Sequence, residues 1–178
     1  VQEHKKRIII GNMNAYTSKV VFKVIMQNKH WVGASIHSGD REFRVPNSYP
    51  MNASAWRIDE SGNKYIRVKG VRWFTNLDYD ERHDDLILYK KYTPEEYPKY
   101  DNYEAINVDK TADIPMDYAG VIGVPITFLD KYNPDQFKLV GSNRDIDQDP
   151  NKTYGRSTYL NGKETFKRLF IINKKIKE

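Results

Sequence analysis

Three consecutive isoleucines at residues 8–10 constrain the fold more than any other short segment of this chain. A strand with one face in solvent alternates apolar and polar residues, whereas a strand buried on both faces is apolar throughout, as in a parallel sheet. The run at residues 7–11 (RIIIG) therefore predicts a doubly buried strand. A helix capped by Thr17 or Ser18 follows it, and then a second strand at residues 31–36. The apolar positions that fall on one face of this helix are Val20, Val21, Val24 and Ile25.

This strand, helix and strand make one right-handed βαβ crossover. A parallel sheet needs neighbouring elements over both of its faces, yet nothing later in the chain repeats the unit. We therefore expect its partner strands to lie upstream of Val1, so that the chain is an incomplete fragment of a larger α/β protein.

The later part of the chain has the pattern of short β-strands. Residues 56–58 and 65–68 alternate apolar and polar side chains around a turn at residues 59–63, which predicts a hairpin. Asn161-Gly162 is a second hairpin signal. Tyr, Pro, Asn and Asp dominate residues 92–118, which we read as a long ordered loop. Further strands are expected at residues 71–75, 86–89, 120–129 and 168–172.

The formal net charge of +5 is distributed unevenly. Residues 1–50 carry 8 Lys/Arg against 3 Asp/Glu, a balance of +5, and residues 151–178 carry 8 against 2, a balance of +6. Residues 101–150 carry 4 against 10, a balance of −6. Two basic ends around an acidic middle predict a positively charged face that attracts polyanions. On charge alone, lysines that only keep the surface soluble explain the pattern equally well.

The composition also bears on compartment. The absence of cysteine excludes disulfides and cysteine-bound zinc. No apolar run has the length of a membrane span, and no signal segment opens the chain. We therefore expect a cytoplasmic protein with no membrane partner.

Residues that could perform catalysis are scarce. His83, Asp84 and Asp85 are adjacent, but adjacent side chains point in different directions, so a solvated turn is favoured over a metal site. The glycines at residues 120–123 lack the spacing of a dinucleotide fingerprint. The segment 133–135 (NPD) lacks the second proline and aromatic residue of an amino-methylating site and is interpreted as a turn. We expect no catalytic residue and no metal ligand.

Aromatic residues beside basic residues are more suggestive of nucleic acid. Such segments occur at residues 72–76 (RWFTN), 89–92 (YKKY) and 154–156 (YGR). Arg and Lys neutralise phosphates, Asn and Arg read base edges, and aromatic rings stack on extruded bases. For Trp73 and Phe74 a place in the hydrophobic core is the favoured alternative.

Several of these stretches closely resemble the EcoRI-type family of adenine-specific DNA methyltransferases. They are residues 8–15 (IIIGNMNA), 37–40 (HSGD), 72–77 (RWFTNL), 100–108 (YDNYEAINV) and 123–137 (GVPITFLDKYNPDQF). The resemblance extends over nearly the whole chain from Lys6 and implies transfer of a methyl group from S-adenosylmethionine to N6 of adenine in double-stranded DNA. It also implies the end of a methyltransferase-like, Rossmann-type sheet at residues 1–91 and a β-rich target-recognition region at residues 92–178.

The family's chemical motifs are absent from this sequence. Such enzymes hold the methyl donor in a Gly-rich pocket and the adenine amino group in an Asn/Asp-Pro-Pro-aromatic tetrapeptide, and neither occurs here. The resemblance implies that both lie in a preceding N-terminal half of the same enzyme. We therefore expect this chain to bind no cofactor and to be inactive alone, and S-adenosylmethionine to serve the full-length parent only.

We place DNA recognition in residues 125–168, because this stretch combines strand-like segments, the Asn161-Gly162 turn and several polar residues, and because it follows the acidic loop, which would repel phosphate. Base readout is assigned to Asn143, Arg144, Tyr154 and Arg156, and phosphate positioning to Lys152, Lys163, Lys167 and Arg168. An alternative is that Arg144 and Arg156 pair with nearby acidic residues and never touch DNA. Those acidic residues are Asp145, Asp147 and Asp149.

Two other functions compete with a methyltransferase fragment. A stand-alone nucleic-acid-binding module without catalysis is the main alternative, and the unsupported βαβ start disfavours it. A metal-dependent nuclease is disfavoured because no paired acidic residues with a following Lys form a cluster.

Overall fold

The computed structural model describes residues 5–37, 39–52, 55–143 and 157–177. Its helical elements are α1 (Lys19–Met26) and the 3-10 turns η1 (Met13–Thr17), η2 (Asp80–His83), η3 (Thr111–Asp113) and η4 (Ile126–Lys131). Its strands are β1 (Ile8–Asn12), β2 (Trp31–Val32), β3 (Arg41–Val45), β4 (Trp56–Ile58), β5 (Lys64–Val68), β6 (Val71–Thr75), β7 (Ile106–Asn107), β8 (Ile122–Pro125), β9 (Phe137–Ser142), β10 (Tyr159–Leu160), β11 (Lys163–Glu164) and β12 (Arg168–Asn173).

The first sheet has the strand order β1-β6-β2. The predicted strand, helix and strand are present, and β1 and β2 run in the same direction. They are not neighbours, however, because β6 lies between them and is antiparallel to both. The second strand is also shorter than residues 31–36, since β2 ends at Val32.

The isoleucines of β1 do not have the predicted double burial within the described residues. Ile8 is 61% exposed and Ile10 is 54% exposed, and the outer edge of β1 has no partner strand in this part of the chain. Burial on both faces requires neighbouring elements that the described residues do not supply, so the predicted burial is not reached within this chain. Ile10 pairs with Trp73, so these two side chains share the uncovered face of the sheet.

Helix α1 begins where the sequence predicts. The Ser18 side chain accepts a hydrogen bond from the Val21 backbone N–H at 3.3 Å, which satisfies one of the free donors of the first turn. The buried face differs from the prediction, because Phe22 and Ile25 are buried whereas Val20 is 75% exposed. Position 22 is one turn before the buried Ile25, and the larger Phe ring takes the core-facing position.

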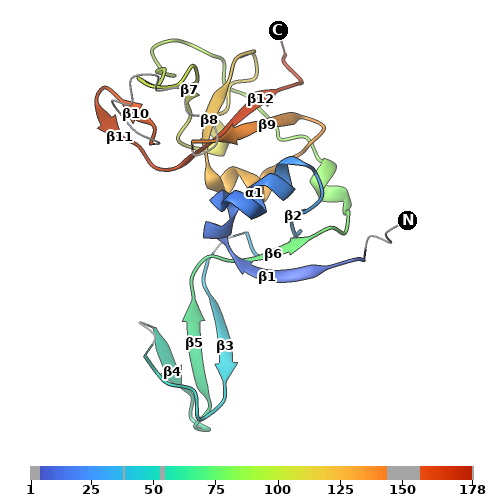
Figure 1. Cartoon of the computed structure of the whole chain (residues 1–178), viewed down its shortest axis with the longest axis vertical. Helices are drawn as coiled ribbons and strands as arrows, with labels where there is room; N and C mark the ends of the chain where they lie inside the picture. Colours follow the sequence, from blue (N-terminus) through green and yellow to red (C-terminus); the bar gives the residue numbers. More distant parts are fainter. Residues whose placement is uncertain (1–4, 38, 53–54, 144–156, 178) are drawn as a thin grey trace.

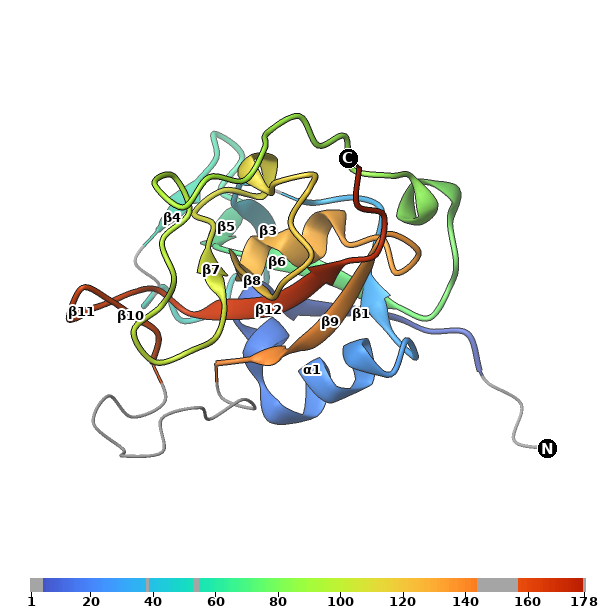
Figure 2. The same cartoon turned by 90° about the horizontal axis from the view of Figure 1, so that it is seen from above.

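The second sheet has the order β7-β8-β12-β9, with β12 antiparallel to both of its neighbours. Figure 2 shows β12 running across this sheet between β8 and β9. The predicted last strand is confirmed as β12, and the Asn161-Gly162 hairpin is confirmed between β10 and β11. Residues 86–89 do not form the predicted strand, and residues 120–129 divide into β8 and η4.

The main hydrophobic core lies between the two sheets, where α1 and η4 fill the space (Figure 1). It combines Phe22 of α1, Phe74 of β6, Phe128 of η4 and Ile171 of β12. This cluster therefore draws on residues from both sides of position 91. The division into regions 1–91 and 92–178 stays a prediction. In the part of the chain that the structure describes, no helix is long and apolar enough to cross a membrane.

A β-arm, defined as strands β3, β4 and β5 with their connecting loops, projects away from this body (Figure 1). Its strand order is β3-β5-β4, and both pairings are antiparallel. The hairpin predicted from the turn at residues 59–63 is confirmed as β4 and β5, whereas β3 was not expected. At the tip, the Asp59 carboxylate accepts backbone hydrogen bonds from Ser61 at 3.0 Å and Asn63 at 2.8 Å.

Candidate nucleic-acid interface

The β-arm emerges at one particular edge of the first sheet. Since β1 and β2 are both antiparallel to β6, their carboxyl ends lie at the edge where β6 begins with Val71. The arm is inserted between the end of β2 and the start of β6, so it leaves the sheet at this same edge. In open α/β sheets, ligands bind outside the carboxyl ends of the parallel strands. The arm therefore begins where a substrate of such a sheet is expected.

Two hydrogen bonds fix the root of the arm next to the end of β1. The Asn12 side-chain amide donates to the Lys69 carbonyl at 2.7 Å, and the Met13 backbone N–H donates to the Gly70 carbonyl at 2.7 Å. Gly70 has φ +67°, a left-handed conformation that glycine adopts without the strain of a Cβ atom. This turn redirects the chain from β5 into β6.

A buried ion pair holds the other side of the root. Arg72 donates to both carboxylate oxygens of Asp130 at 2.9 Å, and the side chains are only 4% and 7% exposed. The Arg72 guanidinium also donates to the His37 carbonyl at 2.8 Å, which ties down the loop that enters the arm. The Tyr16 hydroxyl donates to Asp130 at 2.7 Å, and burial together with this carboxylate raises the pKa of Tyr16. Arg72 is therefore a structural residue of the arm's root.

One face of the arm, which we call the cationic face, is built from alternate residues of its strands. Cross-strand partners share a face, so the pairs Glu42–Arg67, Arg44–Tyr65 and Arg57–Tyr65 place these side chains together. The set comprises Glu42, Arg44, Arg57, Tyr65 and Arg67.

Glu42 organises two of the arginines on the cationic face. Its carboxylate lies 2.9 Å from Arg57 and 3.6 Å from Arg67, and the hydrogen bond from Arg57 holds the pKa of Glu42 below its ordinary value. The Arg57 guanidinium also stacks over the Tyr65 ring, 4.2 Å from its centroid. Three arginines against one glutamate leave this face with an excess of two positive charges.

The opposite face of the arm, the apolar face, carries Phe43, Ile66 and Trp56 in one cross-strand row. Trp56 is 52% exposed and Ile58 is 51% exposed. Arg41 and Lys64 add charge on this face but lie at the ends of their strands. The two faces of the arm thus differ in chemistry.

Two of the residues that the sequence assigned to DNA contact are accessible. Lys163 in β11 and Lys167 before β12 are both exposed, as a phosphate contact requires. Arg144, Lys152, Tyr154 and Arg156 lie outside the described residues. The assignments of these six residues stay predictions.

The other two assigned residues, Arg168 and Asn143, are buried. Arg168 donates to Asp109 at 2.6 Å and to Asn107 at 3.2 Å, so its guanidinium is engaged inside the protein. The Asn143 carbonyl accepts from the Tyr103 hydroxyl at 2.9 Å. Since neither side chain is exposed, we do not include them in the interface proposed below.

The remaining aromatic and acidic candidates have structural roles. Phe74 is buried in the main hydrophobic core, which agrees with the core alternative, whereas Trp73 is only partly buried on the face that also carries Ile10. His83 lies 2.8 Å from Asp135 and 2.9 Å from Asp78, and among the described residues no group of three His, Cys, Asp or Glu side chains could hold a metal ion.

The groove beside β1 and α1 is mostly apolar. It is lined by Ile9, Val20 and Val24 and also by Arg7 and His30, and its volume is about 310 Å³. The sulfonium of S-adenosylmethionine is a cation, so a groove that contains a basic residue and no acidic residue does not suit it. This groove therefore does not fit the cofactor.

The cationic face could not be predicted from the sequence, because its residues are spread over three strands. The local signals were alternations within single strands: residues 41–45 (REFRV) place Glu42 and Arg44 on one face, and residues 64–68 (KYIRV) do the same for Tyr65 and Arg67. These two sets and Arg57 come together only when the three strands pair.

Comparison with known sequences identifies the family. The sequence profile described as "Adenine-specific methyltransferase EcoRI" matches residues 1–177. The chain belongs to this EcoRI methyltransferase family.

Relatives within the EcoRI methyltransferase family are longer than this chain. The chain is 44% identical over 180 residues to the Type II methyltransferase M.EcoRI of Escherichia coli, a match covering 100% of this chain and 53% of that protein. It is 34% identical over 143 residues to M.MpnI of Mycoplasma pneumoniae, covering 78% of this chain and 44% of that protein. The chain thus spans about half the length of these relatives. No solved structure matches it significantly.

Proposed function

We propose that this chain is the C-terminal portion of an S-adenosylmethionine-dependent DNA methyltransferase that methylates N6 of adenine. In this proposal the chain contributes DNA binding and target recognition, and the donor pocket and the Asn/Asp-Pro-Pro-aromatic tetrapeptide belong to the preceding half of the same enzyme. Family membership supports the reaction class, and the relatives are about twice as long as this chain.

One observation carries the fragment part of the proposal. Strand β1 is an edge strand of the described sheet, so its outer edge has no partner strand there. Its side chains Ile8 and Ile10 are both more than half exposed on one face of the sheet. An edge strand rich in exposed isoleucine pairs readily with another strand. A strand and helix from the preceding half of the enzyme would bury this surface and extend the sheet.

The experiment rebuilds the enzyme by fusing the N-terminal half of the E. coli relative to residues 1–178. We expect the fusion to form N6-methyladenine in duplex DNA with S-adenosylmethionine, measured by mass spectrometry of digested nucleosides. Residues 1–178 alone should give no product and no heat of cofactor binding in calorimetry.

Activity or micromolar cofactor binding by the isolated chain would contradict the proposal. A matched fusion that carries Ile8→Lys and Ile10→Lys tests whether β1 is the surface that the N-terminal half covers. We expect this fusion to lose activity while residues 1–178 with the same changes stay folded, because both side chains are exposed in the isolated chain. The cytoplasmic location expected from the sequence stays a prediction.

A further inference from the structure

We propose that the cationic face of the β-arm binds the phosphate backbone of duplex DNA, with Arg57 and Arg67 as phosphate contacts and Glu42 as their counter-ion in the free protein. This inference rests on the proposed function, because it assumes that DNA is the substrate. It locates the DNA surface on residues 41–69 rather than on residues 125–168.

The position of the β-arm supports DNA binding. The arm leaves the sheet at the carboxyl edge of β1 and β2, where ligands of open α/β sheets bind. The contacts of Asn12 with Lys69 and of Arg72 with His37 fix its root. The arm projects from the body (Figure 1), so its strands can reach along a duplex that lies at this edge.

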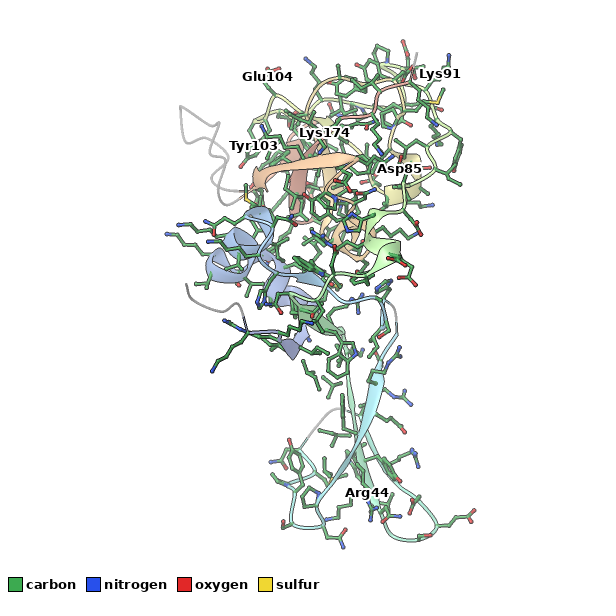
Figure 3. The ribbon with its side chains drawn as sticks, turned by 90° about the vertical axis from the view of Figure 1, so that its right-hand side faces the viewer. Arg44, Asp85, Lys91, Tyr103, Glu104 and Lys174 are labelled. Carbon is green, nitrogen blue, oxygen red and sulfur yellow. The ribbon has the colours of Figure 1, made fainter. Side chains whose placement is uncertain are left out.

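The net positive charge of the β-arm also supports DNA binding. Residues 41–69 contain six Lys/Arg and three Asp/Glu, a balance of +3, whereas residues 101–150 carry a balance of −6. Polyanions are attracted to the positive part of such a surface. Arg44 and Glu104 lie toward opposite ends of the molecule (Figure 3), so a duplex on the arm lies far from Glu104 in the acidic part.

The arrangement of the side chains indicates which face of the arm contacts phosphate. On the cationic face Arg57 is held over the Tyr65 ring and against Glu42, so its guanidinium is oriented before any ligand arrives. A planar guanidinium with several donors binds a phosphate in two places at once. The apolar face is dominated by Phe43, Trp56 and Ile58, and its two basic residues, Arg41 and Lys64, lie at the ends of their strands.

Glu42 makes the proposal testable by a gain of binding. In free protein it neutralises part of the charge of Arg57 and Arg67, and it repels phosphate when DNA is bound. Glu42→Gln removes that repulsion and keeps the shape of the side chain. A variant that only damaged the fold could not bind DNA more tightly than the unaltered protein.

The experiment measures binding of residues 1–178 to a fluorescein-labelled 30-base-pair duplex by anisotropy between about 50 and 200 mM salt. The Arg57→Gln/Arg67→Gln variant should lower the slope of log K against log salt by about two, because each phosphate contact contributes about 0.9. Its dissociation constant at about 0.1 M salt should rise more than about tenfold. Glu42→Gln should tighten binding.

Two controls carry equal charge changes elsewhere. Arg41→Gln/Lys64→Gln removes two positive charges from the opposite face of the same arm, and we expect its slope to fall by less than about one. Glu104→Gln removes a carboxylate from an exposed pair with Lys99, 3.5 Å away, and should leave the affinity unchanged.

The outcomes separate this inference from the proposed function. If the unaltered chain binds duplex DNA with a steep salt dependence but Arg57→Gln/Arg67→Gln leaves the slope unchanged, the arm inference is wrong and DNA binding resides elsewhere. If Arg41→Gln/Lys64→Gln loses as much binding, the assignment of the face is wrong. If the unaltered chain shows no binding even at the lowest salt, the proposed contribution to DNA binding fails with it.

Discussion

The buried pair of Arg72 and Asp130 gives a quantitative prediction about stability. Asp130→Asn keeps the size of the side chain but removes its charge, which leaves the Arg72 guanidinium buried without a counter-ion. Breaking a buried pair by removing one partner destabilises a protein by about 3–5 kcal/mol. We expect about 3 kcal/mol here, because the asparagine oxygen still accepts one hydrogen bond from Arg72 or Tyr16.

That loss is large compared with the total stability of a domain, which is about 5–15 kcal/mol. The assay is equilibrium unfolding of residues 1–178 in urea, followed by tryptophan fluorescence. With a slope of about 2 kcal/mol per molar urea, the midpoint should fall by about 1.5 M. The pair joins β6 to η4 across 58 residues, so the whole core should lose stability rather than the arm alone.

Two further variants test the reasoning. Glu104→Gln removes a carboxylate from a pair whose side chains are 60% and 85% exposed, and its effect should stay within about 0.5 kcal/mol. Replacing both partners, as Arg72→Met/Asp130→Leu, should recover much of the loss because no unpaired charge remains. A change below about 1 kcal/mol for Asp130→Asn would refute the argument that this pair is buried and mutually dependent.

Two more predictions concern a histidine and a glycine. Hydrogen bonds from His83 to Asp135 and then Asp78 raise the pKa of His83, so their stabilisation is present below its ordinary pKa and is lost as pH rises through the raised value. The difference in melting temperature between the unaltered protein and His83→Gln should therefore be largest near pH ~5.5 and vanish near pH ~9, and a difference that grows with pH would contradict the pairing. Gly123→Ala places a Cβ 2.5 Å from the buried Tyr100 ring, so urea unfolding should show a loss of about 1–3 kcal/mol, and unchanged stability would mean that Tyr100 moves aside freely.

Several local features could be predicted from the sequence, because neighbouring residues determine them. Ser18 caps α1, Asn161-Gly162 turns a hairpin, and the Asp59 side chain closes the turn at the tip of the arm. Each depends on hydrogen bonds or backbone angles within a few residues. The motifs quoted from the chain were also enough to indicate the family, which the match over residues 1–177 shows independently.

Burial, by contrast, was decided by tertiary structure. The isoleucines of β1 have the composition of a doubly buried strand, yet their exposure depends on which elements lie beside them. Residues 86–89 also have the composition of a strand, but Leu88 is buried, Ile87 is exposed, and no strand pairing forms there. Strand propensity alone does not supply a pairing partner.

The candidate site was likewise determined by contacts distant in sequence. The sequence shows Arg168 as one more basic residue near a basic end, whereas the fold encloses it beside Asp109, 59 residues away. Glu42, Arg57 and Arg67 gather on one face only because β3 and β4 both pair with β5. The sequence by itself determined the family, the caps and the turns, while tertiary structure decided which arginines are buried and which are presented together, because charge is visible in composition but proximity is created by strand pairing.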